Sequence, residues 1–264
     1  MAAPLVPNDP VPSDPGFKPD RGSDEFAGQV RGMFDRIAGV YDRMNGAMTA
    51  GLDERWRARS ADLVRLIPGE AALDVCCGTG DLALQLAHRV GPSGRVVGCD
   101  FSERMLELAR RKGRAAAIAE PEALCEPRFE SADALALPYP DGEFDAVTVG
   151  FGARNLADLD LGLREMARVL RPGGRLAILE ITQPQRQPLA SFFSIWFDRI
   201  VPRLGVLAGE DAAYSYLPES VKRFPLPADL AVRIDAAGFG AIRWSILAGG
   251  IIAIHSAELP AATV

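Results

Sequence analysis

The pattern of apolar and polar positions changes once along this chain. Between Glu25 and Ile67, apolar residues such as Met33 and Ile37 recur every three to four positions, which predicts amphipathic helices. From Ala72 onward, short apolar runs alternate with helical stretches of roughly ten residues. This alternation is typical of a parallel, doubly wound α/β sheet in which helices join successive strands.

The pattern also predicts where the individual elements lie. We expect strands at 72–76, 96–99, around Phe129, and at 144–150, 175–181, 241–247 and 251–256. We expect helices at 81–90, 103–112, 159–170 and 228–237. The predicted fold is therefore a mostly parallel, seven-stranded sheet preceded by an N-terminal helical region.

The same pattern suggests how the chain is organised. Residues 1–24 are rich in proline and aspartate and cannot bury enough apolar surface, which predicts a disordered tail. Residues 25–257 are predicted to form one domain, with a helical region at 25–67 and an insert at 184–226. Residues 258–264 are expected to be a short C-terminal tail.

The insert contains an unusually apolar stretch at 189–207, with only Asp198, Arg199 and Arg203 charged. Helical spacing of this kind is typical of a core helix, and it also fits the interface of a homodimer. Two functional interpretations stay open beside these: a lid over an apolar substrate, and an amphipathic segment that contacts a membrane surface.

Residues 73–81 (LDVCCGTGD) indicate a strand, a glycine turn and the start of a helix. The next strand ends at Asp100, 22 residues after Gly78. This is the layout of a nucleotide-binding βαβ unit, in which Gly78 and Gly80 allow close approach of the backbone and the acid binds ribose hydroxyls. The alternative is an ordinary strand-to-helix turn with acids at exposed strand ends.

Two details of this unit bear on the cofactor. Ala83 stands where the dinucleotide fingerprint has its third glycine, and Asp74 lies within the strand before the turn. An acid there would repel a pyrophosphate but not the cationic S-adenosylmethionine, which is therefore the predicted cofactor. The Thr79 hydroxyl and amides at the helix N-terminus would bind its carboxylate.

Later residues extend the predicted cofactor site. Asp133 could bind the exocyclic amine of an adenine, and Ala134 could provide an apolar wall, although a solvated turn would look the same. Phe101, next to Asp100, and Gly150, at the end of the strand 144–150, complete the predicted set of cofactor residues.

Arg154 and Asn155 follow the strand 144–150, at the sheet edge where open α/β sheets bind ligands. They could equally be a surface charge and, with Asp158, caps of the next helix. His255 near the chain end could be a satisfied structural histidine or a catalytic one.

Composition restricts the remaining possibilities. The net charge of −6 argues against a nucleic-acid surface, which needs a basic stripe. No apolar run reaches the roughly 18 residues of a membrane span, and no secretory signal is evident. The four cysteines show no metal-ligand spacing, and there are only two histidines. We therefore expect a reduced, cytoplasmic protein without a metal.

Several segments together resemble the ubiquinone/menaquinone-biosynthesis C-methyltransferases, the UbiE/MenG family. The segments are 30–38, 41–45, 73–81, 151–155, 164–166, 171–175, 214–221 and 249–255. The likeness runs from about Val30 to Ala257, and it implies a Rossmann-like class I S-adenosylmethionine-dependent methyltransferase. Thr79, Asp100, Asp133 and Ala134 fall on cofactor positions of that family.

The resemblance implies methylation of a prenylated quinol ring carbon, such as demethylmenaquinol to menaquinol. A phenol with a pKa near 10 must lose its proton to make that carbon nucleophilic. Arg154 is the candidate that stabilises the phenolate or orders a water, and Asn155 would orient that water or the substrate. Tyr41, Tyr216 and His255 are further candidates in the pocket.

The chain departs from the family pattern at several positions. Cys77 stands where alanine is common, Gly150 where a hydroxyl residue is often found, and Asp53 where histidine or glutamine is frequent. Residues 180–182 read Glu-Ile-Thr in place of the usual Glu-Phe-Ser. These changes concern the pocket rim and substrate fit more than the type of reaction.

Alternative functions stay open at this point. They are a benzoquinol methyltransferase of the ubiquinone pathway, a small-molecule O- or N-methyltransferase, a nicotinamide-dependent reductase, and a non-catalytic ligand-binding member of a quinone-making complex. A prenylated substrate would give the apolar 189–207 stretch a purpose, because a cytoplasmic enzyme must collect that substrate from a bilayer. Transient, peripheral contact with a membrane is therefore expected.

Overall fold

The computed structural model describes residues 25–185, 187, 193 and 211–261. The predicted tail 1–24, almost all of the apolar 189–207 stretch and the last three residues lie outside the described residues. Within these limits, the predicted insert contributes a helix at Asp211–Arg223.

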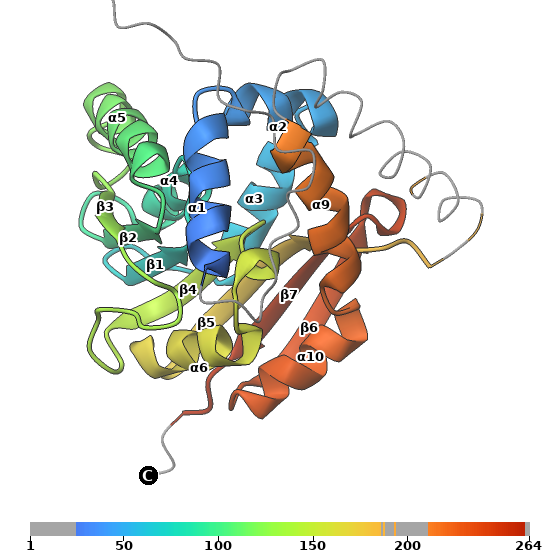
Figure 1. Ribbon diagram of the computed structural model, residues 1–264. Helices are drawn as coiled ribbons and strands as arrows, with labels where there is room; N and C mark the ends of the chain where they lie inside the picture. Colours follow the sequence, from blue (N-terminus) through green and yellow to red (C-terminus); the bar gives the residue numbers. More distant parts are fainter. Residues whose placement is uncertain (1–24, 186, 188–192, 194–210, 262–264) are drawn as a thin grey trace, which may run out of the picture.

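Seven strands form one sheet in the order β3-β2-β1-β4-β5-β7-β6 (Figure 1). The strands are β1 (Ala71–Val75), β2 (Arg95–Asp100), β3 (Arg128–Ser131), β4 (Phe144–Gly150), β5 (Leu170–Ile181), β6 (Gly240–Leu247) and β7 (Ile252–Glu258). β1 to β5 run parallel, and β7 is antiparallel to both β5 and β6. The predicted mostly parallel, seven-stranded sheet is confirmed.

The helices of the described residues include all the predicted ones, and three that were not predicted, at 153–155, 211–223 and 248–250. The helices are α1 (Phe26–Ile37), α2 (Tyr41–Thr49), α3 (Leu52–Leu63), α4 (Asp81–Val90), α5 (Glu103–Ala119), η1 (Ala153–Asn155), α6 (Leu159–Val169), α9 (Asp211–Arg223), α10 (Pro227–Ala236) and η3 (Ala248–Gly250). Of the predicted helices, only α5 differs clearly, because it continues past Gly113, where the prediction ended. The alanines at 115–117 favour the helix strongly enough to carry it through that glycine.

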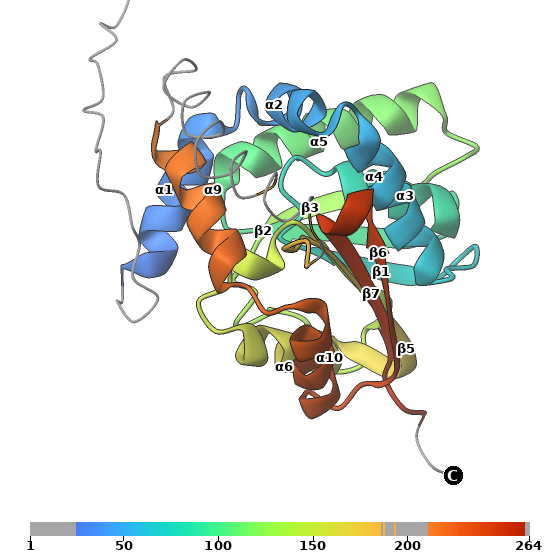
Figure 2. The same ribbon diagram turned by 90° about the vertical axis from the view of Figure 1, so that its right-hand side faces the viewer.

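The sheet separates two buried layers (Figure 2). Strand residues alternate between its faces. Ala72 and Val96 pack with α3 and α4 on one face, and Leu73 and Ile178 pack with α6 and α10 on the other. The predicted doubly wound arrangement is therefore present, with the largest apolar side chains on both sides of the parallel strands.

Helices α1, α2 and α9 cover the carboxyl ends of the parallel strands. Both views show α1 and α9 side by side (Figures 1 and 2). Phe26, Val30 and Met33 lie on one stripe of α1 and pack against Tyr216 of α9. The N-terminal helical region thus closes over the sheet edge where ligands bind in open α/β folds.

Three glycines pack around the Phe129 ring. A Cβ atom at Gly80, Gly98 or Gly113 would lie 2.9, 2.7 or 2.9 Å, respectively, from that ring. Real Cβ atoms do not approach so closely, so β2, α5 and the turn before α4 meet at Phe129 only because these positions lack side chains. Gly80 is thus explained by packing as well as by its φ of +89°.

We expect Gly98→Ala to lower the free energy of unfolding by about 1–3 kcal/mol, because the added methyl group overpacks the Phe129 site. Gly46→Ala is the control, since a Cβ there meets nothing within 4 Å and the change should stabilise α2 by about 0.5–1 kcal/mol. Urea-induced unfolding measures both, and equal effects of the two substitutions would contradict the packing argument.

Candidate functional site

Two adjoining hollows lie at the carboxyl ends of β1, β2 and β4. The smaller is lined by Gly78 and Gly150, and the larger, of about 440 Å³, by Asp133 and Ala134. Cys76, Asp100, Phe101 and Asn155 line both hollows. The two hollows are therefore parts of one groove, called the cofactor groove below, and most of the predicted cofactor residues line it.

The Asp100 carboxylate is central to this groove. Its oxygens accept hydrogen bonds from the backbone amides of Gly78 and Ser102, each at 2.9 Å. Burial raises the pKa of Asp100 to about 6, although these amides counteract the effect. Asp100 therefore holds the glycine turn in place and is ionised above that pH. Binding of ribose hydroxyls by this carboxylate stays a prediction.

Asn155 lies within the cofactor groove. Its Oδ1 is buried and has no hydrogen-bond partner in the described part of the chain. Buried polar atoms are almost always paired, so this oxygen fits a donor that a bound ligand brings. The sequence analysis expected Asn155 to orient a water or the substrate, whereas the structure places it on the cofactor side.

The backbone at the groove is strained at two neighbouring strand ends. Cys76 and Phe151 have φ values of +54° and +60°, in the left-handed region that residues with side chains rarely occupy. A Cβ on Gly152 would lie only 2.3 Å from the Cβ of Cys76. Such strain clusters at ligand sites, and here the close approach requires a glycine at position 152.

Near the end of β3, Asp133 folds its own turn. Its Oδ1 accepts a hydrogen bond of 2.8 Å from the amide of Leu135. Ala134 is 8% exposed and lines the larger hollow, and its role as an apolar wall for an adenine stays a prediction. The segment that carries both residues begins beside Asp100, since β3 pairs with β2 in parallel and Ser131 lies opposite Asp100.

Asp74 lies within the sheet, on the face that packs against α3 and α4. It faces Thr148 across the β1–β4 pair and accepts a hydrogen bond of 2.7 Å from that hydroxyl. Burial raises the pKa of Asp74 to about 7, and no described residue hydrogen-bonds its Oδ2. A direct contact with the cofactor stays a prediction for this residue.

The Thr79 hydroxyl joins the glycine turn to two helices. It donates to Asp42 of α2 at 2.6 Å and accepts from Lys112 of α5 at 3.1 Å. Lys112 also pairs with Asp42 at 2.7 Å and with Asp81 at 2.5 Å. The sequence analysis assigned this hydroxyl to the cofactor carboxylate, and that role stays a prediction because the structure gives the hydroxyl other partners.

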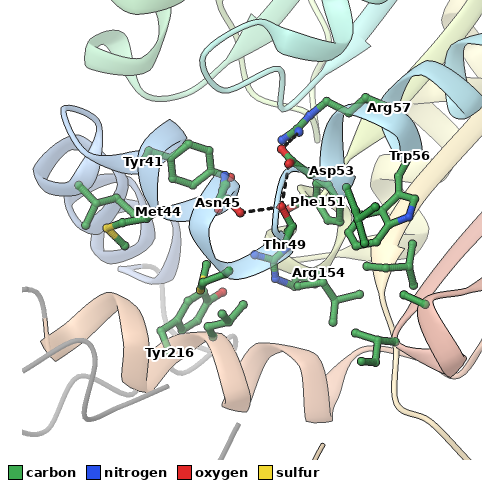
Figure 3. A pocket seen from close by; sticks show the side chains of 18 of the residues that line it. Tyr41, Met44, Asn45, Thr49, Asp53, Trp56, Arg57, Phe151, Arg154 and Tyr216 are labelled. Atoms are coloured by element: carbon green, nitrogen blue, oxygen red, sulfur yellow. Dashed lines mark hydrogen bonds and ion pairs between the residues drawn. The ribbon is translucent and has the colours of Figure 1, made fainter. Parts of the chain in front are cut away.

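A second cavity, of about 390 Å³, adjoins the cofactor groove (Figure 3). Its lining is mainly apolar and comes from α1, α2, α3, α9 and the ends of β4, β5 and β7. The apolar lining residues include Met33, Ile37, Met44, Met48, Leu52, Trp56, Ile181, Phe193, Leu217, Ile251 and Ile252. Phe34, Tyr41 and Phe151 line both this apolar cavity and the cofactor groove, so the two spaces meet at these rings.

Arg154 lies in the wall of the apolar cavity and is held from behind by Glu180. Its Nη1 donates to Glu180 Oε1 at 2.9 Å and to the carbonyl of Phe151, and its backbone amide donates to Glu180 Oε2. Burial alone would lower the pKa of Arg154, but Glu180 raises it, so the guanidinium stays charged. The cavity therefore contains a fixed cation.

Asp53 and Arg57 form a second charged pair in the same wall, on α3. Their ion pair is joined by Thr49, whose Oγ1 lies 2.7 Å from Asp53 Oδ1. The Arg57 guanidinium also lies over the Phe151 ring, 5.3 Å from its centroid. The sequence analysis noted Asp53 only as a departure from a family pattern; the spacing of four residues between Asp53 and Arg57 was the available signal.

His255 is not among the described residues that line the cofactor groove or the apolar cavity. This residue lies on β7, where side chains alternate, so Ile252 and Ile254 face the apolar cavity side and His255 faces α10. It is 1% exposed, its Nε2 lies 2.9 Å from the carbonyl of Pro227, and its ring stacks on Trp244. These contacts favour the structural interpretation of this histidine, although its Nδ1 has no hydrogen-bond partner among the described residues. A catalytic role stays a prediction.

The described residues contain no cluster of histidine, cysteine, aspartate or glutamate that could bind a metal ion. Nor does the described chain contain a helix that is both long and apolar enough to cross a membrane.

Comparison with known proteins relates the chain to one family. Residues 22–258 match the ubiE/COQ5 methyltransferase family. The chain is 46% identical over 229 residues to a demethylmenaquinone methyltransferase of Thermus thermophilus, covering 86% of this chain and 100% of that protein. It is 44% identical to a demethylmenaquinone methyltransferase of Deinococcus radiodurans, and the match covers 84% of this chain and 90% of that protein. A ubiquinone/menaquinone biosynthesis C-methyltransferase of Teredinibacter turnerae is 37% identical, and the match covers 91% of this chain and 94% of that protein.

Solved structures share the fold at lower sequence identity. A [4+2]-cyclase, SpnF, is 21% identical with a TM-score of 0.67, covering 89% of this chain and 97% of that one. A SAM-dependent methyltransferase from Aquifex aeolicus is also 21% identical, with a TM-score of 0.54. The match covers 74% of this chain and 84% of that one. The predicted class I methyltransferase fold is thereby confirmed, while the cyclase shows that the fold alone does not decide the reaction.

The buried Asp74 predicts a pH dependence of stability in the ligand-free protein. Its pKa rises from the ordinary 3.8 to about 7 on folding, so the protonated form stabilises the fold below about pH 4, and that contribution is lost as the pH rises through 7. Asp74→Asn removes this dependence. Between pH 4 and pH 8, the unfolding free energy of the wild type should fall by about 2–4 kcal/mol relative to the variant.

Chemical denaturation at both pH values measures this difference. Asp229→Asn is the control, because Asp229 is exposed and the substitution should leave the pH dependence as it is. Parallel curves for the wild type and Asp74→Asn would show that Asp74 is ionised in the folded protein throughout.

Proposed function

This chain belongs to the ubiE/COQ5 methyltransferase family, and from that premise we propose that it methylates a ring carbon of a prenylated quinol. It is an S-adenosylmethionine-dependent methyltransferase, and we assign it the conversion of demethylmenaquinol to menaquinol. The two relatives with the 46% and 44% matches are named for demethylmenaquinone, which favours the naphthoquinol over the benzoquinol.

One observation carries the proposal: a cavity with mainly apolar walls and a fixed cation opens onto the cofactor groove. Its apolar walls suit an aromatic ring and the beginning of a prenyl chain. The two spaces meet at Phe34, Tyr41 and Phe151, so a ring in the cavity can approach a ligand in the groove. This arrangement supplies the orientation on which a transfer between two bound molecules depends.

The residues of the groove fit S-adenosylmethionine. Asp100 would accept hydrogen bonds from the ribose, Asp133 and Ala134 would bind the adenine, and the buried Oδ1 of Asn155 needs a donor such as an ammonium group. When bound, this cofactor supplies an electrophilic methyl group. The protein contributes the position of the acceptor ring and the charge around it.

Arg154 would act on the quinol. A hydroquinone carbon becomes nucleophilic when the adjacent hydroxyl loses its proton, and a buried cation stabilises the phenolate so formed. Glu180 accepts one hydrogen bond from the guanidinium and one from the backbone amide of Arg154, so the cation does not need to reorganise when the negative charge develops. Tyr41 and Tyr216 line the same cavity and could contact the substrate oxygens.

We also propose that the protein contacts a membrane surface while it collects its substrate, because a prenylated quinol resides in the bilayer. Leu52, a lining residue of the apolar cavity, is 41% exposed, so apolar lining reaches the protein surface beside α2 and α3. The predicted homodimer stays a prediction. A liposome flotation assay with and without demethylmenaquinol tests the membrane contact.

The function is tested by methyl transfer from labelled S-adenosylmethionine to reduced demethylmenaquinone, with a reduced benzoquinone precursor and a soluble phenol in parallel. We expect label on the naphthoquinol. Label on the soluble phenol alone would favour the small-molecule methyltransferase, and cofactor binding without label on any acceptor would favour the non-catalytic alternative.

Arg154→Ala should reduce the rate of methyl transfer by about 100-fold or more, because the phenolate loses its fixed cation. Binding of S-adenosylmethionine should change less than threefold, since Arg154 lines the apolar cavity. Isothermal titration calorimetry measures the binding, and labelled transfer measures the rate.

Two further variants serve as controls for Arg154→Ala. Arg154→Lys keeps the charge that Glu180 needs but loses the planar fork, and it should retain part of the activity. Arg164→Ala, at an exposed position of α6, should have wild-type activity. An unchanged rate in Arg154→Ala would remove the proposed role of this residue.

A further inference from the structure

The polar groups of the apolar cavity differ in the hydrogen bonds that they can make. Arg154 and Arg57 are donors only, while the hydroxyls and the amide of Tyr41, Thr49 and Asn45 can act in either sense. Among the described residues that line this cavity, Asp53 is the single carboxylate. When ionised, a carboxylate can only accept hydrogen bonds.

The surroundings of Asp53 keep it ionised. Burial would raise the pKa of Asp53, but the hydrogen bond from Thr49 and the guanidinium of Arg57 bring it below the ordinary value. The Asp53 side chain is 13% exposed and that of Arg57 is 9% exposed, so water screens the pair only weakly. At neutral pH the cavity therefore presents a fixed acceptor as well as a fixed donor.

Part of the acceptor capacity of Asp53 is left for a ligand. Thr49 contacts Oδ1 and Arg57 contacts Oδ2, whereas a carboxylate offers about four acceptor sites. Figure 3 shows Asp53 between these two partners in the cavity wall. The other acid nearby, Glu180, is buried and accepts hydrogen bonds from Arg154 and from the amide of Ile181.

The two charged pairs come from different elements, and both contact Phe151. Arg57 covers the face of Phe151, and Arg154 donates to the carbonyl of that residue. Asp53 comes from α3 and Arg154 from η1, so the cavity has two charged positions around Phe151. A 1,4-hydroquinone likewise carries two oxygens, on opposite carbons of its ring.

We propose that Asp53 accepts a hydrogen bond from a quinol hydroxyl and so selects the reduced ring over the oxidised one. This inference rests on the proposed function. A quinol brings an O–H donor to the carboxylate, whereas a quinone brings only a carbonyl oxygen, which the carboxylate repels. Arg154 can donate to either form and does not discriminate. The selection matters because only the reduced ring is nucleophilic at carbon.

The test compares binding of the two redox forms of demethylmenaquinone with a short prenyl chain. The protein is saturated with S-adenosylhomocysteine, and dissociation constants are measured by calorimetry, anaerobically with reductant for the quinol and without reductant for the quinone. The wild type should bind the quinol at least about tenfold more tightly than the quinone, as expected for a hydrogen bond to a charged group.

Asp53→Asn should reduce this preference to within about threefold, because an amide can donate to a carbonyl oxygen. Glu54→Gln, the neighbouring exposed acid, should keep the wild-type preference. Should Asp53→Asn fail to fold because Arg57 loses its partner, the variant Asp53→Asn/Arg57→Gln removes both charges and makes the same comparison.

The outcomes separate this inference from the proposed function. A wild type that methylates demethylmenaquinol, beside an Asp53→Asn protein with an unchanged quinol-to-quinone preference, would overturn the role of Asp53 alone. A wild type that binds both forms equally would also overturn it. A wild type that neither binds nor methylates the quinol would overturn the proposed function itself.

Discussion

The site depends on one buried carboxylate, that of Glu180. It is 1% exposed, and it accepts hydrogen bonds from the Arg154 guanidinium, the Arg154 amide and the Ile181 amide. Through these bonds it fixes η1 against the end of β5 and directs a cation into an apolar space. Removing one partner of a buried pair leaves an uncompensated charge, so the geometry of the site and the stability of this sheet edge are coupled.

The sequence predicted the sheet and the cofactor groove well, for a physical reason. Parallel strands bring their carboxyl ends to one edge, so Gly78, Asp100, Asp133 and Gly150 could be placed together without knowledge of any helix. Hydrophobic alternation gave the strands to within a few residues. The predicted end of α5, at residue 112, was wrong because the alanines after Gly113 continue the helix to Ala119.

The apolar cavity was much less predictable. Its wall depends on how α1, α2, α3 and α9 pack over the sheet, and helical periodicity alone does not determine that packing. Asp53 and Arg57 were consequently not recognised as a pair in the site. The placement of His255 was not predictable either, because the face of β7 on which it lies follows from the pairing of β7 with β5 and from the position of Pro227.

Strand ends form the cofactor groove and helices form much of the apolar cavity, and this difference has an evolutionary consequence. The cofactor groove is built from strand ends whose spacing the whole sheet fixes, while much of the apolar cavity comes from helices laid over that edge. Substitutions in 41–57 or along α9 can therefore alter which ring or tail is accepted without disturbing the groove. Phe34, Tyr41 and Phe151 are the exceptions, because they belong to both spaces. The range of substrates can therefore diversify within such a scaffold, while substitutions at these three aromatic positions are restricted.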